Sequence, residues 1–374
     1  MIVAMKISHA ILSFVFRLIP RSKKILVFSS FPDYADNSYA MYEYLEANMN
    51  GKYKNIWIFE DKASVAKHPQ VKCFYKYSLK AFYYFARARY AFTTHGIYMF
   101  LNHGKDNKIV NLWHGMPLKK IGCMDSQGDP ANHNKAGYMI ATSHLFQEIM
   151  SKSFKDMDIS RVLPVGQPRN DLMFKDTDFF INRGIDPKDY STIGVWLPTY
   201  RQSIIGDIRN DGIYNSNGIS FLSMEELSRL NRFLQETSSL LIVKIHPMDA
   251  LQQVNFEKFS NLMIIKPQDF QEQLYPLLGA SHYLLTDYSS VWVDYSILRR
   301  PIGFVMNDIE EYRNSRGLTI DNLDKKLPGT IIDTYQKLTE FISNPPEFDD
   351  THLGLYNLHC DNRSSERLAS QLGL

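Results

Sequence analysis

Two histidines follow hydrophobic stretches that are typical of buried strands. His114 comes after Ile109–Trp113 and precedes Gly115, and His246 comes after Leu240–Ile245. Imidazole has an ordinary pKa of about 6.5, which suits proton transfer near neutral pH. We expect His114 to accept a proton from an attacking hydroxyl, with Gly115 letting the substrate approach the ring, and His246 to donate a hydrogen bond or a proton to a phosphate. The alternative for each is a histidine satisfied at the end of its strand.

A third hydrophobic stretch runs into hydroxyl groups at the point where a helix begins. Tyr283–Thr286 is followed by Asp287, and then by Ser289 and Ser290. The first turn of a helix offers unpaired backbone N–H groups and the positive end of the helix dipole. The sequence therefore predicts that Thr286, Ser289 and Ser290 bind phosphate, with Asp287 in the same turn. The alternative is that Ser289 only caps the helix.

Arg201 follows another predicted strand, Thr192–Leu197, by four residues. The carboxyl ends of parallel strands meet at one edge of a sheet, so we expect Arg201 to emerge beside the serines. A guanidinium there makes charge-assisted hydrogen bonds to phosphate oxygens. A solvated surface arginine is the alternative.

The elements that must position these residues alternate between strand and helix almost throughout the chain, which predicts an α/β fold with parallel sheets and crossover helices. Ligands of such sheets bind beyond the carboxyl ends of the strands, where the strand order reverses. The predicted strands are Lys24–Phe28, Asn55–Phe59, Tyr90–Thr93, Lys108–Leu112, Tyr138–Ala141, Val162–Val165, Thr192–Leu197, Leu240–Ile245, Leu262–Ile265, Tyr283–Thr286 and Ile302–Val305.

With 374 residues, the chain is too long for one ordinary core and suits two α/β domains with a cleft between them. The pattern breaks after Gly166–Asp171, in a polar run that extends to Tyr190. We therefore predict an N-terminal domain over 24–185 and a C-terminal domain over 186–346. The last residues, 347–374, are expected to form a closing C-terminal helix.

The first segment, 1–23, is apolar but is interrupted by Lys6, His9 and Arg17. A transmembrane helix needs about 20 predominantly apolar residues, and no signal-peptide cleavage site follows. One interpretation is an amphipathic helix on a membrane surface, with Arg17, Arg21, Lys23 and Lys24 contacting anionic headgroups. The other is a first helix packed on its own domain.

Composition excludes several classes of function. Lys and Arg number 42 against 40 Asp and Glu, a net charge of +2, and no basic run interleaves with aromatic residues, so nucleic acid is not an expected partner. Three widely spaced cysteines fit neither a disulfide framework nor a metal site, and they favour a reducing, cytoplasmic compartment. The nicotinamide, P-loop, zincin and α/β-hydrolase motifs are missing from the sequence. We expect no cofactor and no metal.

Five motifs, in order, resemble the CDP-glycerol glycerophosphotransferase family, which primes and polymerises teichoic acid and related polymers. The resemblance runs from about Lys24 to the C-terminus. Its motifs are Trp113–Lys119, Gly166–Asp171, Pro198–Arg201, Lys244–Pro247, and Thr286–Ser290 with Asp294. The resemblance implies a GT-B type fold, in which two facing Rossmann-like domains hold the CDP-alcohol mainly in the C-terminal domain and the acceptor in the N-terminal one.

The resemblance also implies a mechanism. The diphosphate lies on the helix that opens at Ser289 and Ser290, with Arg201 and His246 bonded to its oxygens, and His114 activates the acceptor hydroxyl. The motifs add Gly115, Asp287, Asp294 and Arg169 to the candidate site. The hydroxyl attacks the phosphorus that carries glycerol, and CMP leaves. Positioning and charge stabilisation can account for such a transfer without a metal.

The expected donor is CDP-glycerol or CDP-ribitol, and the expected acceptor is a lipid-linked saccharide or polyol phosphate at the inner face of the cell membrane. One departure from the family lies at Cys360–Arg367, which lacks an acidic residue and a glycine of the family pattern. Two other classes stay open: a GT-B glycosyltransferase that uses a nucleotide sugar, and a non-catalytic nucleotide-binding protein of an assembly complex.

Overall fold

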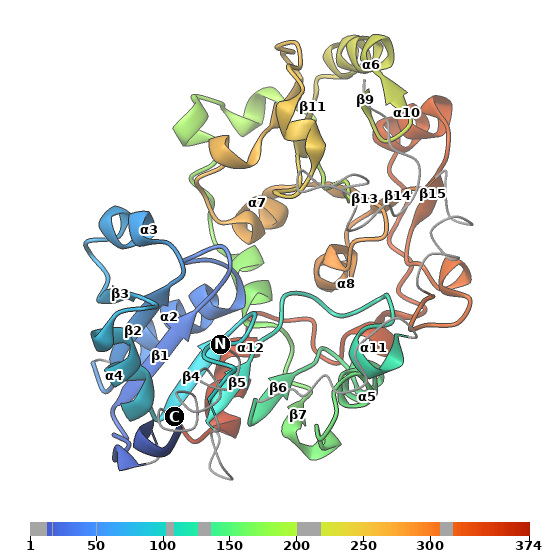
Figure 1. The fold of residues 1–374 in the computed structure, drawn as a ribbon. Helices are drawn as coiled ribbons and strands as arrows, with labels where there is room; N and C mark the ends of the chain where they lie inside the picture. Colours follow the sequence, from blue (N-terminus) through green and yellow to red (C-terminus); the bar gives the residue numbers. More distant parts are fainter. Residues whose placement is uncertain are drawn as a thin grey trace, which may run out of the picture. The chain divides into compact units, whose positions relative to one another are not determined.

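The computed structural model describes residues 13–16, 18–49, 51–101, 108–125, 136–199, 218–306 and 317–374. The chain forms two compact units (Figure 1). Unit 1 comprises Met1–Met116, Asp129–Leu172 and Asp361–Leu374, and unit 2 comprises Pro117–Gly128 and Met173–Cys360. Arg201 and most of the N-terminal segment lie outside the described residues.

Unit 1 is built on a seven-stranded parallel sheet in the order β3-β2-β1-β4-β5-β6-β7. Its strands are β1 (Ile25–Ser29), β2 (Lys54–Phe59), β3 (Cys73–Tyr75), β4 (Tyr90–Thr93), β5 (Ile109–Asn111), β6 (Tyr138–Ile140) and β7 (Val162–Leu163). The chain runs outward from β1 to β3 and then returns to place β4 on the other side of β1. The reversal between β1 and β4 is where a sheet of this kind binds its ligand.

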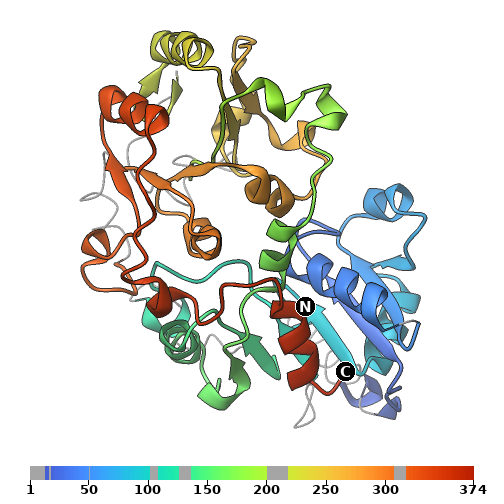
Figure 2. The same ribbon diagram turned by 180° about the vertical axis from the view of Figure 1, so that it is seen from behind.

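The helices of unit 1 are α2 (Asp36–Asn48), α3 (Lys62–Lys67), α4 (Leu79–Arg87), α5 (His144–Ser153) and α12 (Ser364–Gln371). Ser78 and Ser143 cap α4 and α5 by accepting hydrogen bonds from the third backbone N–H of each helix. The last helix, α12, packs against α2 (Figure 2). Leu368 of α12 lies in one core cluster with Leu26 and Phe28 of β1.

Unit 2 contains a six-stranded parallel sheet in the order β12-β11-β8-β13-β14-β15. Its strands are β8 (Thr192–Trp196), β11 (Ser239–Lys244), β12 (Leu262–Ile265), β13 (Tyr283–Thr286), β14 (Ile302–Val305) and β15 (Thr330–Ile332), and a small antiparallel pair joins β9 (Gly218–Ile219) to β10 (Leu222–Ser223). Here the strand order reverses between β8 and β13.

The helices of unit 2 are α6 (Met224–Glu236), α7 (Leu274–Ala280), α8 (Val291–Tyr295), α10 (Tyr335–Ser343) and α11 (Leu353–Tyr356). The capping box that the sequence predicts at Ser223 is present, with Glu226 as its second member. Leu227, Leu230 and Leu234 of α6 are fully buried. Short 3-10 turns occupy Gly122–Met124, Ile159–Arg161, Pro168–Phe174, Ile181–Arg183, Pro187–Asp189, Ala250–Gln253, Pro267–Asp269, Ser296–Leu298 and Leu323–Lys325.

The α/β prediction with parallel sheets is confirmed, and all eleven predicted strands exist to within two residues at each end. Four short strands were not predicted: β3 and β15 at sheet edges, and the antiparallel pair β9 and β10. The compact units also differ from the contiguous ranges predicted as domains. The chain leaves unit 1 after Leu172, and the last helix belongs to unit 1 rather than forming a segment of its own. The reason is that the Asp171 carboxylate accepts hydrogen bonds from the backbone of Ser364 and Ser365 at the start of α12.

The described part of the N-terminal segment is helical at residues 13–16. Phe16 is buried and stacks on Phe85 of α4, whereas Phe14 and Leu18 are 64% and 66% exposed. None of the helices in the described ranges has the length and apolar character needed to cross a bilayer. Whether the segment 1–23 lies on a membrane stays a prediction.

Candidate functional site

His114 lies two residues beyond Leu112, the predicted end of the strand that the structure shows as β5. It is close to the point in unit 1 where the strand order reverses. Its Nδ1 atom is 3.3 Å from the carbonyl oxygen of Thr94, which follows β4. A carbonyl oxygen only accepts hydrogen bonds, so Nδ1 carries the proton and Nε2 carries the lone pair. His114 is therefore held in the tautomer that accepts a proton at Nε2.

Two aromatic rings stack on the His114 imidazole. The ring of His95 lies 4.2 Å from it, centroid to centroid, at an interplanar angle of 8°, and the Trp113 ring lies 4.5 Å away at 24°. Phe154 packs edge-on against Trp113. The stack fixes the plane of the imidazole, and the Thr94 hydrogen bond fixes its rotation within that plane.

Protein atoms crowd the imidazole although His114 as a whole residue is exposed. This desolvation is the largest cause that lowers the pKa of His114, to about 4, and repulsion from His95 acts in the same direction. The hydrogen bond to Thr94 and the Asp36 carboxylate raise this pKa, but they do not outweigh the crowding. His114 is consequently neutral at pH 7, as a proton acceptor must be.

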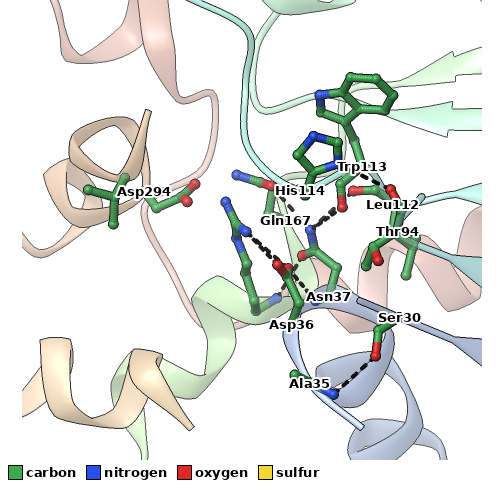
Figure 3. A network of polar contacts seen from close by, with 12 residues as sticks. Ser30, Ala35, Asp36, Asn37, Thr94, Leu112, Trp113, His114, Gln167 and Asp294 are labelled. Carbon is green, nitrogen blue, oxygen red and sulfur yellow. Dashed lines mark hydrogen bonds and ion pairs between the residues drawn. The ribbon is translucent and has the colours of Figure 1, made fainter. Parts of the chain in front are cut away.

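Asn37, in the first turn of α2, braces the backbone that carries His114 (Figure 3). Its side-chain amide donates to the carbonyl oxygens of Leu112 and Trp113 at 3.1 and 3.2 Å, and to Gln167 Oε1 at 3.2 Å. The side-chain oxygen of Asn37, Oδ1, accepts from the backbone N–H of Arg169 at 3.0 Å. One fully buried amide thereby ties α2, the strand that precedes His114 and the Gly166–Asp171 motif together.

Arg169, which the family motifs added to the candidate site, is 5% exposed. Its Nη1 atom is bonded to both carboxylate oxygens of Asp36, at 3.0 and 2.9 Å. This places Arg169 within the bracing of the site, in an ion pair with the first residue of α2. Asp36 and Asn37 had no signal in the sequence, because neither follows a predicted strand directly, whereas Gln167 belongs to the Gly166–Asp171 motif.

The backbone around His114 adopts left-handed conformations on both sides. Trp113 has φ of 54°, Gly115 has φ of 132°, and Asp36 has φ of 61°. Such conformations cost a non-glycine residue about 1–3 kcal/mol and persist only where surrounding contacts determine them. The Asn37 hydrogen bond to the Trp113 carbonyl is one such contact. Gly115 is buried.

The turn after β13 in unit 2 is organised around Asp287. Its carboxylate accepts from the backbone N–H of Thr199 at 2.9 Å and from the Thr199 hydroxyl. The Thr286 hydroxyl donates to the carbonyl oxygen of Leu197 at 3.1 Å. Both residues are buried, and they join the carboxyl ends of β8 and β13, where the strand order of this sheet reverses. Thr286 and Asp287 thus shape this edge of the sheet.

Ser289 and Ser290 are half-buried and begin α8 as predicted. Ser289 Oγ accepts from the backbone N–H of Val291 at 3.4 Å, so this side chain does serve as a helix cap. Ser290 has the backbone position of the cap but makes no capping hydrogen bond with its side chain. The two serines therefore differ: the Ser289 hydroxyl bonds to the first residue of α8, whereas the Ser290 hydroxyl makes no capping hydrogen bond.

His246 lies two residues beyond β11, half-buried at the same edge of the unit 2 sheet. Its Nδ1 atom accepts a hydrogen bond from the backbone N–H of Met248 at 3.0 Å. An accepting Nδ1 has no proton, so His246 carries its proton on Nε2. This is the tautomer that donates a hydrogen bond from Nε2, the opposite of His114.

Asp294 is buried and Lys244 is half-buried near these elements. Asp294, in α8, is fully buried and accepts a hydrogen bond from the Tyr275 hydroxyl at 2.6 Å. Lys244 ends β11, and desolvation lowers its pKa to about 8. Its ammonium lies 5.0 Å from the centre of the Phe270 ring. The sequence analysis used Lys244 only as part of a motif. Among the residues that the structure describes, no cluster of three or more His, Cys, Asp or Glu has the arrangement of a metal site.

With this geometry established, comparison with known proteins is decisive. The family model of CDP-glycerol:poly(glycerophosphate) glycerophosphotransferases matches residues 11–372. The chain belongs to this family. It is an enzyme, a glycerophosphotransferase that uses CDP-glycerol, and the predicted resemblance is confirmed.

Individual relatives and a solved structure agree with the family assignment. A teichoic acid poly(glycerol phosphate) polymerase of Bacillus spizizenii is 28% identical over 394 residues, covering 97% of this chain and 96% of the relative. A teichoic acid glycerol-phosphate transferase of Staphylococcus aureus is 25% identical, covering 98% and 97%. A variant of the wall teichoic acid polymerase TagF, soaked with CDPG, has a TM-score of 0.76 at 21% identity and covers 99% of this chain and 96% of that one. The fold is accordingly of the GT-B type.

Proposed function

We propose that this glycerophosphotransferase moves glycerol phosphate from CDP-glycerol to a hydroxyl of a lipid-linked saccharide or polyol-phosphate acceptor, in the synthesis of teichoic acid or a related polymer. The observation that carries the assignment of roles is the opposite tautomers of His114 and His246. One imidazole offers a lone pair at Nε2 and the other offers a proton. These are the two functions that an attacking alcohol and a departing phosphate require.

In the proposed reaction, His114 Nε2 accepts the proton of the acceptor hydroxyl as its oxygen attacks the phosphorus that carries glycerol. The new P–O bond forms while the bond to the bridging oxygen of the diphosphate breaks. CMP leaves with that electron pair, and the phosphodiester product stays on the acceptor. The lowered pKa of His114 keeps it ready to accept the proton at pH 7. No covalent enzyme intermediate is required.

The diphosphate is assigned to unit 2. His246 donates from Nε2 to a phosphate oxygen, and the hydroxyl of Ser290 with the backbone at the start of α8 supplies further donors. Arg201 is proposed to add a positive charge there, although it lies outside the described residues. Asp287 and Thr286 hold the turn in shape through Thr199 and Leu197. Asp294 supports α8 from its buried side.

Glycerol is proposed in preference to ribitol because two relatives named for glycerol phosphate align over 97% and 98% of the chain, at 28% and 25% identity. Relatives named as ribitol-phosphate polymerases of Staphylococcus aureus align over 72% and 71% at 22% identity.

The acceptor is proposed to be reached at a membrane surface, where the exposed side chains of Phe14 and Leu18 enter the interface and Arg21 contacts headgroups.

The test measures CMP release and product mass with CDP-glycerol, CDP-ribitol and a UDP-sugar, each with lipid-linked acceptors. We expect CMP from CDP-glycerol, a product heavier by one glycerol phosphate, and no release from the UDP-sugar. Transfer of a sugar would indicate the glycosyltransferase alternative. Binding of CDP-glycerol without CMP release across all acceptors would indicate a non-catalytic assembly protein and would contradict the proposal.

A further inference from the structure

A second histidine occupies the position beside His114, and the reaction proposed above does not use it. The chain after β4 reads Thr94-His95-Gly96, which repeats the pattern Trp113-His114-Gly115 after β5. β4 and β5 are neighbours in the sheet, so both histidines emerge at the same edge. Both are exposed, and their rings are stacked almost in parallel at 4.2 Å.

The hydrogen bonds of Thr94 assign the tautomer of His95. The Thr94 hydroxyl oxygen lies 2.8 Å from His95 Nδ1 and accepts from the backbone N–H of Phe31 at 3.2 Å. Thr94 is fully buried, so its hydroxyl hydrogen needs an acceptor, and His95 Nδ1 is the atom in place to accept it. The proton of His95 is then on Nε2.

The two rings consequently present different groups to a substrate. Both are anchored through Nδ1 to Thr94, which leaves the two Nε2 atoms on the side of the rings away from Thr94. At that side His114 has a lone pair and His95 has an N–H. One residue, Thr94, sets the two rings in opposite tautomers, because its carbonyl oxygen can only accept and its hydroxyl can donate.

The charges around the pair favour neutral rings. Desolvation lowers the pKa of both imidazoles, and although the Asp36 carboxylate raises both and Glu60 raises that of His95, these charges do not outweigh it. Arg169 lowers the pKa of His114 as well. Asp36 forms an ion pair with Arg169, and the positive guanidinium partly cancels the effect of the Asp36 carboxylate on the two rings.

We propose that His95 is an acceptor-binding residue, whose Nε2–H donates to a second oxygen next to the hydroxyl that His114 deprotonates. The inference rests on the proposed function. It names the class of acceptor end that the site takes, a polyol with two neighbouring hydroxyls. The attacking hydroxyl gives its proton to His114, while the adjacent hydroxyl oxygen accepts from His95.

A neutral pair of one donor and one acceptor fits two hydroxyls better than it fits a phosphate. A phosphate anion accepts hydrogen bonds at every oxygen, so the His114 lone pair would repel it. A hydroxyl both donates and accepts, so two adjacent hydroxyls match the two Nε2 atoms. Holding both oxygens also aligns the attacking one, which is how positioning lowers a barrier.

The experiment compares two acceptors in the full-length enzyme with CDP-glycerol as donor. One acceptor is a decyl phosphodiester ending in glycerol, which has two neighbouring free hydroxyls. The other ends in propane-1,3-diol and has only the terminal hydroxyl. We compare wild type with His95→Phe, which keeps a stacking ring without the donor, and with His95→Gln, which restores an N–H donor. CMP release gives kcat and the KM of each substrate.

We expect wild type to prefer the glycerol end by about tenfold in kcat/KM, the value of one hydrogen bond at the upper end of its usual range. His95→Phe should abolish this preference without changing the KM for CDP-glycerol, and His95→Gln should recover most of it. A His95→Phe enzyme that keeps the preference, or that loses activity equally on both diesters, overturns the assignment. So does a wild type that transfers equally well to both diesters.

Failure of the proposed function gives a different result. In that case wild type releases no CMP from CDP-glycerol with any acceptor, or His114→Ala is as active as wild type. The His95 comparison is a ratio between two acceptors in an active enzyme. Thermal unfolding of each variant separates a loss of fold from a loss of acceptor recognition.

Discussion

Each unit places a histidine just beyond the carboxyl end of a strand of a parallel sheet, yet the two histidines are held in opposite tautomers. His114 donates from Nδ1 to a carbonyl oxygen, whereas His246 accepts at Nδ1 from a backbone N–H. The partner of Nδ1 determines whether Nε2 carries a proton or a lone pair. A single backbone group, rather than the histidine itself, therefore decides whether the ring accepts a proton or donates one.

The two sites also differ in how they are braced. His114 lies between two rings, on a backbone held by Asn37. In unit 2, Asp287 holds the turn after β13 through Thr199, and His246 lies on the loop after β11, with β8 between these two strands in the sheet. We infer that the proton acceptor must be oriented by packing, whereas a donor to a charged phosphate is oriented largely by its partner.

Replacement of His114 by alanine should have the largest effect. Loss of general-base catalysis lowers kcat by about 10²–10⁴-fold. Single-turnover transfer from CDP-glycerol measures it, and His144→Ala, at the exposed start of α5, is the matched control. A near-normal rate for His114→Ala would remove the proposed base from the mechanism.

The effect of replacing His246 on kcat should depend on whether the new side chain offers an N–H donor. His246→Ala removes the donor to the phosphate and is expected to lower kcat by about 10²–10³-fold, the usual cost of losing one such donor. His246→Gln offers an N–H near the same place and should recover part of the rate. If the two variants are equally impaired, Nε2–H donation is not the role of His246.

Asn37→Ala should weaken the site without removing a reacting group. It leaves the carbonyl oxygens of Leu112, which is buried, and Trp113, which is half-buried, without this donor, at a cost of about 1–3 kcal/mol in the free energy of unfolding. The looser His114 should lower kcat more than it raises the KM for CDP-glycerol. Asn48→Ala, at the exposed end of α2, is the control. An unchanged kcat in a folded Asn37→Ala protein would contradict the bracing argument.

The pH dependence should show the smallest but most specific effect. Because the pKa of His114 is lowered to about 4, the neutral base persists well below pH 6.5, and activity should fall only as pH approaches that lower value. The unfolded chain binds the proton more readily in this range, so stability should also decline as pH falls. His95→Phe removes repulsion from the neighbouring ring and should move the acid limb of kcat upward. A shift in the opposite direction would show that His95 does not act on His114.

The sequence predicted the main strands because each is a short hydrophobic stretch, and it placed His114 and His246 at strand ends for the same reason. It did not separate the two histidines by role, because the partners of Nδ1 come from Thr94 in one case and Met248 in the other. The Thr94 contact joins two strand ends and leaves no local pattern, and the Met248 contact depends on how the loop after β11 folds. His95 could have been found from the sequence, since it follows a predicted strand and precedes glycine as His114 does.

The Gly166–Asp171 motif illustrates the same limit. Arg169 has the residue type of a phosphate ligand, but its ion pair with Asp36 depends on α2 packing beside it. Asp171 binds the start of α12, almost 200 residues further along the chain. Their roles in joining elements followed only from the tertiary structure.

The most direct test of the account reads the two tautomers themselves. Protein labelled with ¹⁵N-histidine, at pH 7 and without substrate, gives ring nitrogen shifts and multiple-bond correlations, assigned by His114→Gln and His246→Gln variants. The account predicts a proton on Nδ1 of His114 and on Nε2 of His246. The same tautomer at both positions, or a protonated imidazolium at His114, would contradict it.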